Sequence, residues 1–131
     1  MTAFINSSLT RLVAAALIVC IVAVYIPAPV FAGEKSAAED LKQIQYKYYF
    51  RGEYAGTIDV LKIFLARTDV PAGVEVSARE FLAASYILSG SADKGKDQFL
   101  RLLNDDESYA GPDPAIFKAE VLDAFVTTRD T

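Results

Sequence analysis

Apolar residues recur along most of the chain with the spacing of helices. The first such stretch has one apolar face at i, i+3 and i+7, formed by Leu41, Ile44 and Tyr48. Ser36 and Glu39, just before it, match a capping box, in which the serine oxygen accepts a backbone N–H and the glutamate reaches back. The pattern therefore predicts a helix from Ala37 to about Gly52, because glycine tolerates the left-handed conformation that ends many helices.

Four further helices follow from the same spacing, separated by short segments rich in glycine, proline and serine. We expect them at about Tyr54 to Arg67, Val74 to Leu88, Ala92 to Asn104, and from Asp113 onward. The last one would begin with aspartate as N-cap and proline at the first helical position. No segment shows a convincing strand pattern, so the sequence predicts an all-α fold.

The first four helices form two pairs that repeat one pattern at a spacing of 38 residues. Tyr48 and Gly52 in the first pair correspond to Tyr86 and Gly90 in the second. Each tyrosine would fill the space between its two helices, and each glycine would permit the reversal between them. A small residue on the second helix, Gly95, lets the helices approach closely. Its counterpart Thr57 is larger, which predicts a more splayed first pair.

This unit resembles the tetratricopeptide repeat, a helix-turn-helix unit of about 34 residues. The order of Phe81 to Tyr86, Phe99, Asp113-Pro114-x-x-Phe117 and Phe125 is similar to a group of short bacterial envelope proteins with two repeats and a closing helix. The resemblance implies a right-handed array of two helix-turn-helix pairs plus a C-terminal capping helix. That group usually has Ser-Pro where this chain has Lys118-Ala119. Residues 113–129 are therefore expected to form either one helix or a turn followed by a helix.

The N-terminal residues have the order of parts found in secretory signal peptides. Arg11 precedes an apolar run from Leu12 to Ile26, and Val30-Phe31-Ala32 supplies small residues at the cleavage positions. We therefore expect residues 1–32 to be a signal peptide and residues 33–131 to be a helical domain in the periplasm or secreted. A retained membrane anchor is the competing interpretation, because about 17 to 25 apolar residues span a bilayer. The prolines after the run favour cleavage.

Composition argues against several classes of function. The chain has no histidine, and Cys20, its one cysteine, lies in the apolar run, so the mature domain would lack the usual metal ligands and the commonest general base. The net charge of −4, which becomes −5 without Arg11, is opposite to that of nucleic-acid binders. No glycines are arranged to cradle phosphate. We expect no catalytic residues, no metal, no cofactor and no nucleic-acid partner.

The aromatic run Tyr46-Lys47-Tyr48-Tyr49-Phe50 offers a candidate binding site. One helix face cannot bury all four rings, because successive residues lie about 100° apart. With Tyr48 between the helices, at least one other ring should be partly exposed, and exposed tyrosines on a helix suit partner binding. The alternative, left open here, is that these rings pack on the closing helix through Phe117 and Phe125.

In tetratricopeptide-like folds the first helix of each pair lines the concave face. The resemblance therefore implies a partner-binding groove lined by Lys42, Tyr46, Tyr49, Glu80, Ala84 and Ile87. The expected function is a non-catalytic interaction module, an adaptor or accessory subunit of a bacterial envelope assembly that binds other envelope proteins. A self-associating structural subunit is the alternative, since repeat units stack to bury their open ends.

Overall fold

The structure, a computed structural model, describes residues 36–131, which form five α-helices and one short 3-10 helix. They are α2 (Ala37–Lys47), the 3-10 helix η1 (Tyr49–Arg51), α3 (Tyr54–Leu65), α4 (Ala72–Leu88), α5 (Ala92–Asp105) and α6 (Ala119–Arg129). No strand occurs within this range, which confirms the all-α prediction for this part of the chain. The predicted signal peptide and its cleavage site lie outside the described residues.

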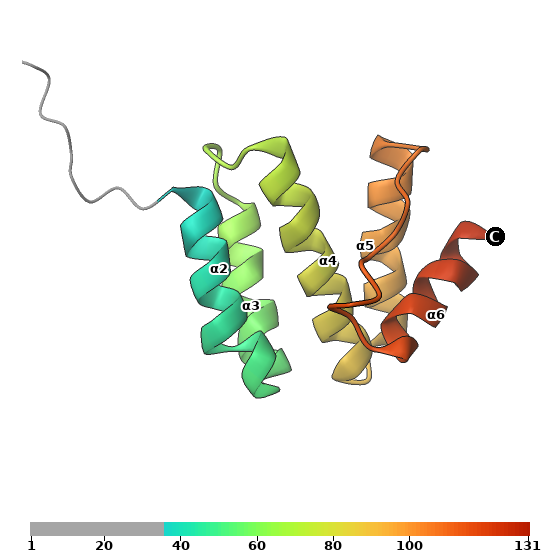
Figure 1. Cartoon of the computed structure of the whole chain (residues 1–131), viewed down its shortest axis with the longest axis horizontal. Helices are drawn as coiled ribbons and strands as arrows, with labels where there is room; N and C mark the ends of the chain where they lie inside the picture. The colour runs from blue at the N-terminus through green and yellow to red at the C-terminus, as the bar shows by residue number, and fades with distance from the viewer. Residues whose placement is uncertain (1–35) are drawn as a thin grey trace, which may run out of the picture. The chain divides into compact units, whose positions relative to one another are not determined.

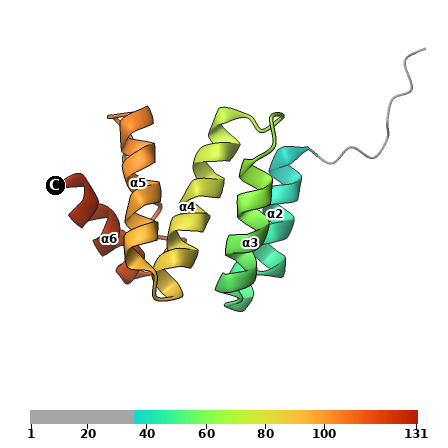
Figure 2. The ribbon, with the colours of Figure 1, turned by 180° about the vertical axis from the view of Figure 1, so that it is seen from behind.

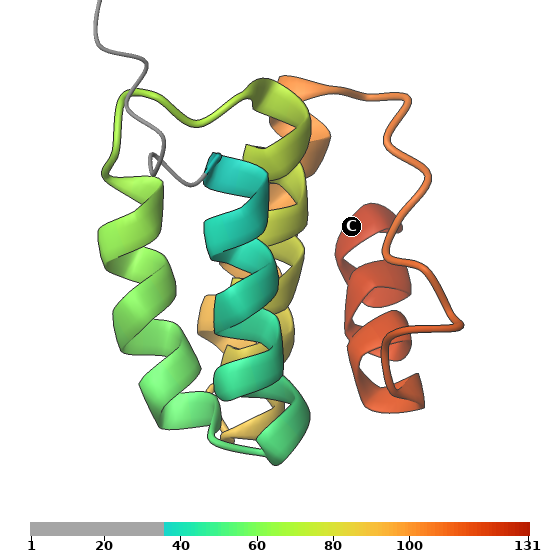
Figure 3. The same cartoon turned by 60° about the vertical axis from the view of Figure 1, so that its left-hand side comes forward.

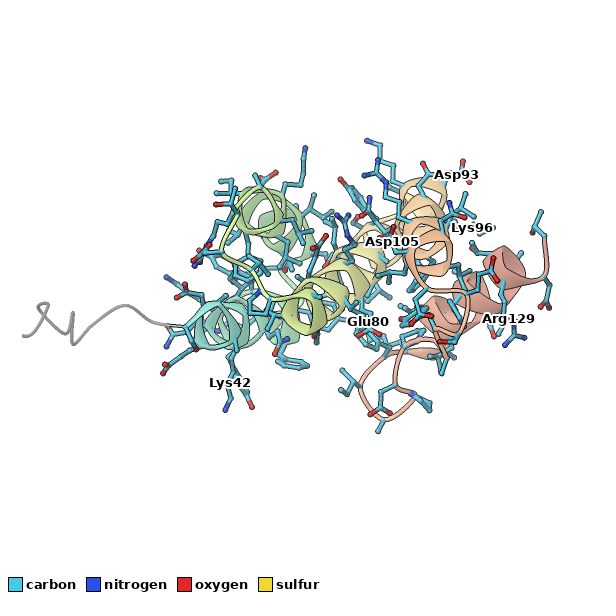
Figure 4. The ribbon with its side chains drawn as sticks, turned by 90° about the horizontal axis from the view of Figure 1, so that it is seen from above. Lys42, Glu80, Asp93, Lys96, Asp105 and Arg129 are labelled. Carbon is cyan, nitrogen blue, oxygen red and sulfur yellow. The ribbon has the colours of Figure 1, made fainter. Side chains whose placement is uncertain are left out.

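These helices follow one another from α2 to α6, each beside its predecessor (Figure 1). α2, α4 and α6 lie in one layer, while α3 and α5 lie in the other, as the view from above shows (Figure 4). The view from behind accordingly shows α3 in front of α2 (Figure 2). α4 is central, because it contacts α2, α3, α5 and α6. No described helix is both long and apolar enough to cross a membrane.

The predicted start of the first helix is confirmed, whereas its last turn differs from the prediction. The Ser36 side chain accepts a hydrogen bond from the Glu39 backbone N–H at 3.3 Å, as a capping residue does. α2 ends at Lys47, and the chain tightens into η1 before it reaches Gly52 at φ 77°. The tighter winding changes the direction of the side chains after Tyr48, which matters for the candidate site.

The two turns within the helix pairs have the same backbone hydrogen bonds. The Glu53 N–H donates to the Tyr48 carbonyl at 3.0 Å, and the Ser91 N–H donates to the Tyr86 carbonyl at 2.8 Å. Gly90 adopts φ 93°, close to the value at Gly52. This left-handed conformation favours glycine at both places. The sequence repeat is therefore also a repeat of backbone geometry at both turns.

The two helices of the second pair pack more closely than those of the first pair, as the sequence predicts. A Cβ atom at Gly95 would lie 2.5 Å from Cγ1 of Ile87 and 2.8 Å from the Ala83 carbonyl oxygen, so α4 and α5 are in close contact there. α2 and α3 make far fewer contacts along their length. The Thr57 side chain is fully buried, and its hydroxyl donates to the Glu53 carbonyl at 2.8 Å. Thr57 therefore takes up space that glycine leaves free in the second pair.

Aromatic rings and leucines fill the core between the two layers. Its fully or almost fully buried members are Leu61, Phe64, Phe81, Leu82, Phe99, Leu102, Phe117, Val121 and Phe125. Phe99 packs against Phe125 of α6 at 5.4 Å between ring centroids. Tyr48 and Tyr86, which the repeat pattern places between the helices of each pair, are only half-buried and pack at the edge of this core.

Residues 106–118, called the crossing segment below, connect α5 to α6 and run over the α4/α6 face of the domain (Figure 3). The predicted helix start at Asp113 is wrong. Its carboxylate accepts from the Ala115 N–H at 2.8 Å and caps a single turn, after which Lys118 is extended with ψ 156°. Phe117 is buried against Phe81, and the chain leaves the turn there because that ring is held in the core. A turn followed by a helix is therefore the arrangement.

Candidate partner-binding surface

The six residues predicted to line a groove do not form one exposed surface. Lys42 and Tyr46 on α2 are exposed, whereas Tyr49 and Ala84 are buried and Glu80 and Ile87 are half-buried. The crossing segment covers part of the face formed by α2, α4 and α6 (Figures 1 and 4). A continuous groove along the first helices of both pairs is therefore absent from the described part of the chain.

Tyr49 belongs to the aromatic core, which corrects its assignment as a groove residue. Only 6% of its surface is exposed. Its ring packs edge-on against Phe81 at 4.8 Å and against Phe117 of the crossing segment at 6.2 Å between centroids. Burial, together with neighbouring Tyr54, raises the pKa of the Tyr49 hydroxyl to about 12. For this ring the packing alternative is the correct one, through Phe117 but not through Phe125.

Glu80 points toward the crossing segment rather than toward open solvent (Figure 4). Its carboxylate accepts a hydrogen bond from the Tyr109 hydroxyl. Burial raises the pKa of the Glu80 carboxyl above its usual value, and the nearby Asp113 acts in the same direction, whereas the bond from Tyr109 opposes both. The pKa of the Tyr109 hydroxyl is strongly raised, chiefly by burial and then by Glu80. The pair fastens the crossing segment to α4.

The remaining two groove residues serve contacts between helices. Ala84 is completely buried in α4, so it offers no surface to a partner. Ile87 is half-buried, and its side chain lies against α5 at Gly95. Both assignments assumed that the whole concave face of α4 is open. That assumption is wrong, because α4 is the central helix and is packed on most of its circumference.

An exposed aromatic pair and three cations remain on α2 and η1. Tyr46 is 63% exposed and Phe50 is 52% exposed, and their ring centroids are 5.5 Å apart. Phe50 also packs edge-on against Tyr49 at 5.5 Å, which anchors the pair to the core. A shallow hollow of about 420 Å³ lies beside Tyr46, lined by Glu39, Lys42, Gln43, Tyr46, Lys47 and Arg51. We call Lys42, Tyr46, Lys47, Phe50 and Arg51 the α2 patch.

The α2 patch is a basic surface on an acidic protein. Three cations and Glu39 line the hollow beside Tyr46, whereas the whole chain carries a net charge of −4. Lys42 points away from α2 on the side opposite α3 (Figure 4). Tyrosine and arginine are enriched among the residues that dominate binding energy at interfaces, and phenylalanine is enriched at interfaces generally. Tyr46 and Phe50 are the two exposed aromatic side chains among residues 36–131.

The predicted groove omitted three members of the patch, Lys47, Phe50 and Arg51, of which Phe50 is the aromatic one. It lies four residues after Tyr46, which on a helix places two side chains on the same face. The spacing alone would have paired the two rings. The groove implied by the resemblance continues along α4 instead.

Acidic side chains among residues 36–131 are not gathered into a metal-binding group. No group of three or more aspartate, glutamate, histidine or cysteine side chains is close enough there to hold a metal ion. The acidic run Asp105-Asp106-Glu107 is exposed, and Asp106 is used locally, since its carboxylate accepts from the Ser108 hydroxyl at 2.6 Å. That bond lowers the pKa of the Asp106 carboxyl.

Comparisons of the chain with protein-family models, with curated proteins and with solved structures found no match.

Proposed function

We propose that this protein is a non-catalytic interaction module of the bacterial envelope, an adaptor or accessory subunit that binds an acidic segment of another envelope protein. The observation that carries the proposal is the α2 patch, in which two neighbouring rings are more than half exposed and three cations lie on the same two short helices. Exposed rings that are held rigid lose little conformational entropy on binding. The basic side chains would select a negatively charged partner.

The proposal includes a tetratricopeptide-like, right-handed array of two helix pairs with α6 as its cap. Two observations support it: the hydrogen-bonded turns at Gly52 and Gly90 recur at the repeat spacing, and the first helices of the pairs neighbour one another, as do α4 and α6. In this array the crossing segment occupies the concave face beside α4. The proposed binding surface therefore lies on the outer part of α2 and not on the concave face.

Export by a cleaved signal peptide is the other part of the proposal, and it would put the domain in the periplasm or outside the cell. The order of Arg11, the apolar run and Val30-Phe31-Ala32 supports it. Intact-mass measurement of the protein recovered from the envelope tests it directly. We expect an N-terminus at Gly33 or within a residue or two. A full-length mass in the membrane fraction would instead favour a retained anchor.

A site-specific crosslinking experiment tests the binding surface. A photo-crosslinking amino acid replaces Tyr46 in one strain and Leu100 in a second, because Leu100 is an exposed apolar residue on α5 and serves as a matched control. We expect a discrete crosslinked species from position 46 that is absent from position 100. Equal crosslinking at both positions, or none at position 46, contradicts the proposal.

The purified complex then tests the chemistry of the partner. Replacing Tyr46 and Phe50 by alanine should weaken binding by about 2 kcal/mol or more, the size expected of aromatic hot spots. Because the partner is expected to be acidic, affinity should also fall as salt is raised, and less so for a variant with Lys42→Gln and Arg51→Gln. A salt-independent affinity would show that the partner is recognised without its charge.

A further inference from the structure

The exposed ring of Phe50 rests on two buried rings, and a ring of the crossing segment packs on the same two. Phe50 lies against Tyr49 at 5.5 Å and against Phe81 at 6.1 Å between centroids. Phe117 lies against Tyr49 at 6.2 Å and against Phe81 at 4.9 Å. Phe50 is the exposed member of these four, which we call the ring cluster. The ring cluster therefore joins the crossing segment to the α2 patch.

The turn after α2 does not itself require aromatic rings. At the places of Tyr49 and Phe50, the second pair has two aliphatic residues, Ile87 and Leu88, yet its turn has the same backbone hydrogen bonds. There α4 stays α-helical up to Leu88, whereas α2 ends at Lys47 and the chain continues as the 3-10 helix η1. Hydrogen-bond geometry is poorer in a 3-10 helix than in an α-helix. The conformation of η1 therefore depends more on the packing of its side chains.

The crossing segment is fastened on both sides of Phe117. Directly after this residue, the Lys118 ammonium group donates a hydrogen bond to the Tyr54 hydroxyl at 3.4 Å. Earlier in the segment, the Tyr109 hydroxyl donates to the Glu80 carboxylate. These two bonds fix the path of the segment, so the position of the Phe117 ring is set by the segment as well as by the core.

We infer that Phe117 is a positioning residue of the α2 patch. By packing on the two rings that support Phe50, it keeps this exposed ring beside Tyr46. The inference rests on the proposed function, because it concerns the binding geometry of the same patch. Without Phe117, Tyr49 and Phe81 would each lose a packed neighbour and would shift toward the space that its ring leaves. Phe50 would then gain conformational freedom, which binding has to remove at a cost in free energy.

Coupling between the crossing segment and the α2 patch acts in both directions. If the position of Phe117 changes the affinity for a partner, the bound partner must stabilise Phe117 in its place to the same extent. A change that draws Phe117 out of the core therefore weakens binding on the other side of the ring cluster. The crossing segment is thus a place from which binding at α2 can be regulated.

Fluorine NMR tests the positioning without any partner. A para-fluorophenylalanine is placed at position 50 of the protein in the form that the cell delivers, and its signal is compared in Phe117→Leu and Phe99→Leu. Both changes remove a buried ring, but Phe99 packs on Phe125, outside the ring cluster. We expect the signal to move toward that of the free amino acid in Phe117→Leu and to stay in place in Phe99→Leu.

Circular dichroism selects a temperature at which both variants are folded. If Phe117→Leu does not fold, Phe117→Met takes its place, because methionine adapts to irregular gaps in a core. A fluorine signal that moves equally in the two variants, or in neither, overturns the inference.

The purified complex tests the consequence for binding. Phe117→Leu should weaken the affinity for the partner by about threefold or more, whereas Phe99→Leu should leave it unchanged. The partner should also slow hydrogen exchange at the Phe117 amide, which donates to the Asp113 carbonyl at 3.0 Å. An affinity that Phe117→Leu leaves unchanged overturns the inference. If crosslinking at position 46 captures no partner, the proposed function fails, and the fluorine comparison still decides whether Phe117 positions Phe50.

Discussion

The two helix pairs share one turn geometry but differ in how closely their helices approach. Gly95 brings α5 against Ile87 and the Ala83 carbonyl, whereas Thr57 occupies the equivalent place in α3. The first pair is correspondingly looser, although hollows of similar volume, about 340 and 330 Å³, lie beside the first and second pairs. A repeat can therefore keep its backbone turns while one side chain changes how closely the two helices of a pair approach.

The largest expected effect comes from the centre of the second pair. Phe99 is completely buried and packs on Phe125, so Phe99→Ala should lower the free energy of unfolding by about 3 to 5 kcal/mol. Urea denaturation followed by circular dichroism measures the loss. Tyr86→Ala should cost clearly less, since Tyr86 is only half-buried. Equal losses at both positions would mean that Tyr86 carries more of the packing than its burial indicates.

Exchanging the small residues tests the comparison directly. Gly95→Thr introduces a Cβ 2.5 Å from Ile87 and 2.8 Å from a backbone oxygen, so it should destabilise the fold by about 1 to 3 kcal/mol, as overpacking does. Gly73→Thr is the control for the change in helix propensity, because nothing lies near a Cβ at Gly73. A loss at Gly95 no larger than that at Gly73 would show that the two helices can separate freely.

A smaller effect is expected from pH. The pKa of Glu80 is raised in the folded protein, so the folded state holds that proton more tightly than the unfolded chain does. This contribution to stability is complete below the ordinary pKa of 4.5 and is lost as pH rises through the raised value. Glu80→Gln should remove this fall while keeping an acceptor for Tyr109. Unfolding measured from about pH 4 to 7 compares it with Glu120→Gln, an exposed control.

The smallest expected effect on stability is at the α2 patch. Tyr46→Ala should change the unfolding free energy by no more than about 0.5 kcal/mol, because the ring is mostly exposed. Tyr49→Ala, three residues later, should instead be strongly destabilising, because its ring packs on Phe81 and Phe117. Thermal unfolding of the two variants compares them. Similar losses would place Tyr46 in the core and remove the main support for the binding surface.

Most of the helices could be predicted because the residues that start and end them act over short distances along the sequence. The capping serine, Ser36, and the glycines of the two turns act on residues within one helical turn, so they can be recognised without the rest of the fold. The start of the last helix was placed wrongly at Asp113. That aspartate does cap a turn, but burial of Phe117 against α4 interrupts the helix there, and this contact joins residues far apart in sequence.

The candidate site was predictable only where it depended on α2 alone. Lys42 and Tyr46 are exposed as expected. Tyr49 and Ala84 are not, because the fold buries both, and residues 106–118, which bring Phe117 against Tyr49, have no helical pattern that reveals their path. Phe50 was recognisable from its spacing to Tyr46, although the 3-10 turn between them was not.

The crossing segment also affects how the protein resists proteases. Phe117 is wedged against Phe81, and Gly111, at φ 103°, lies directly against the Phe125 ring, where any side chain would collide. α6 cannot separate from the rest of the domain unless aromatic rings leave the core. C-terminal ends of proteins ordinarily fray and are trimmed first. Here the amides of α6 should exchange with solvent nearly as slowly as those of α4, so the C-terminal third opens only when the whole domain unfolds.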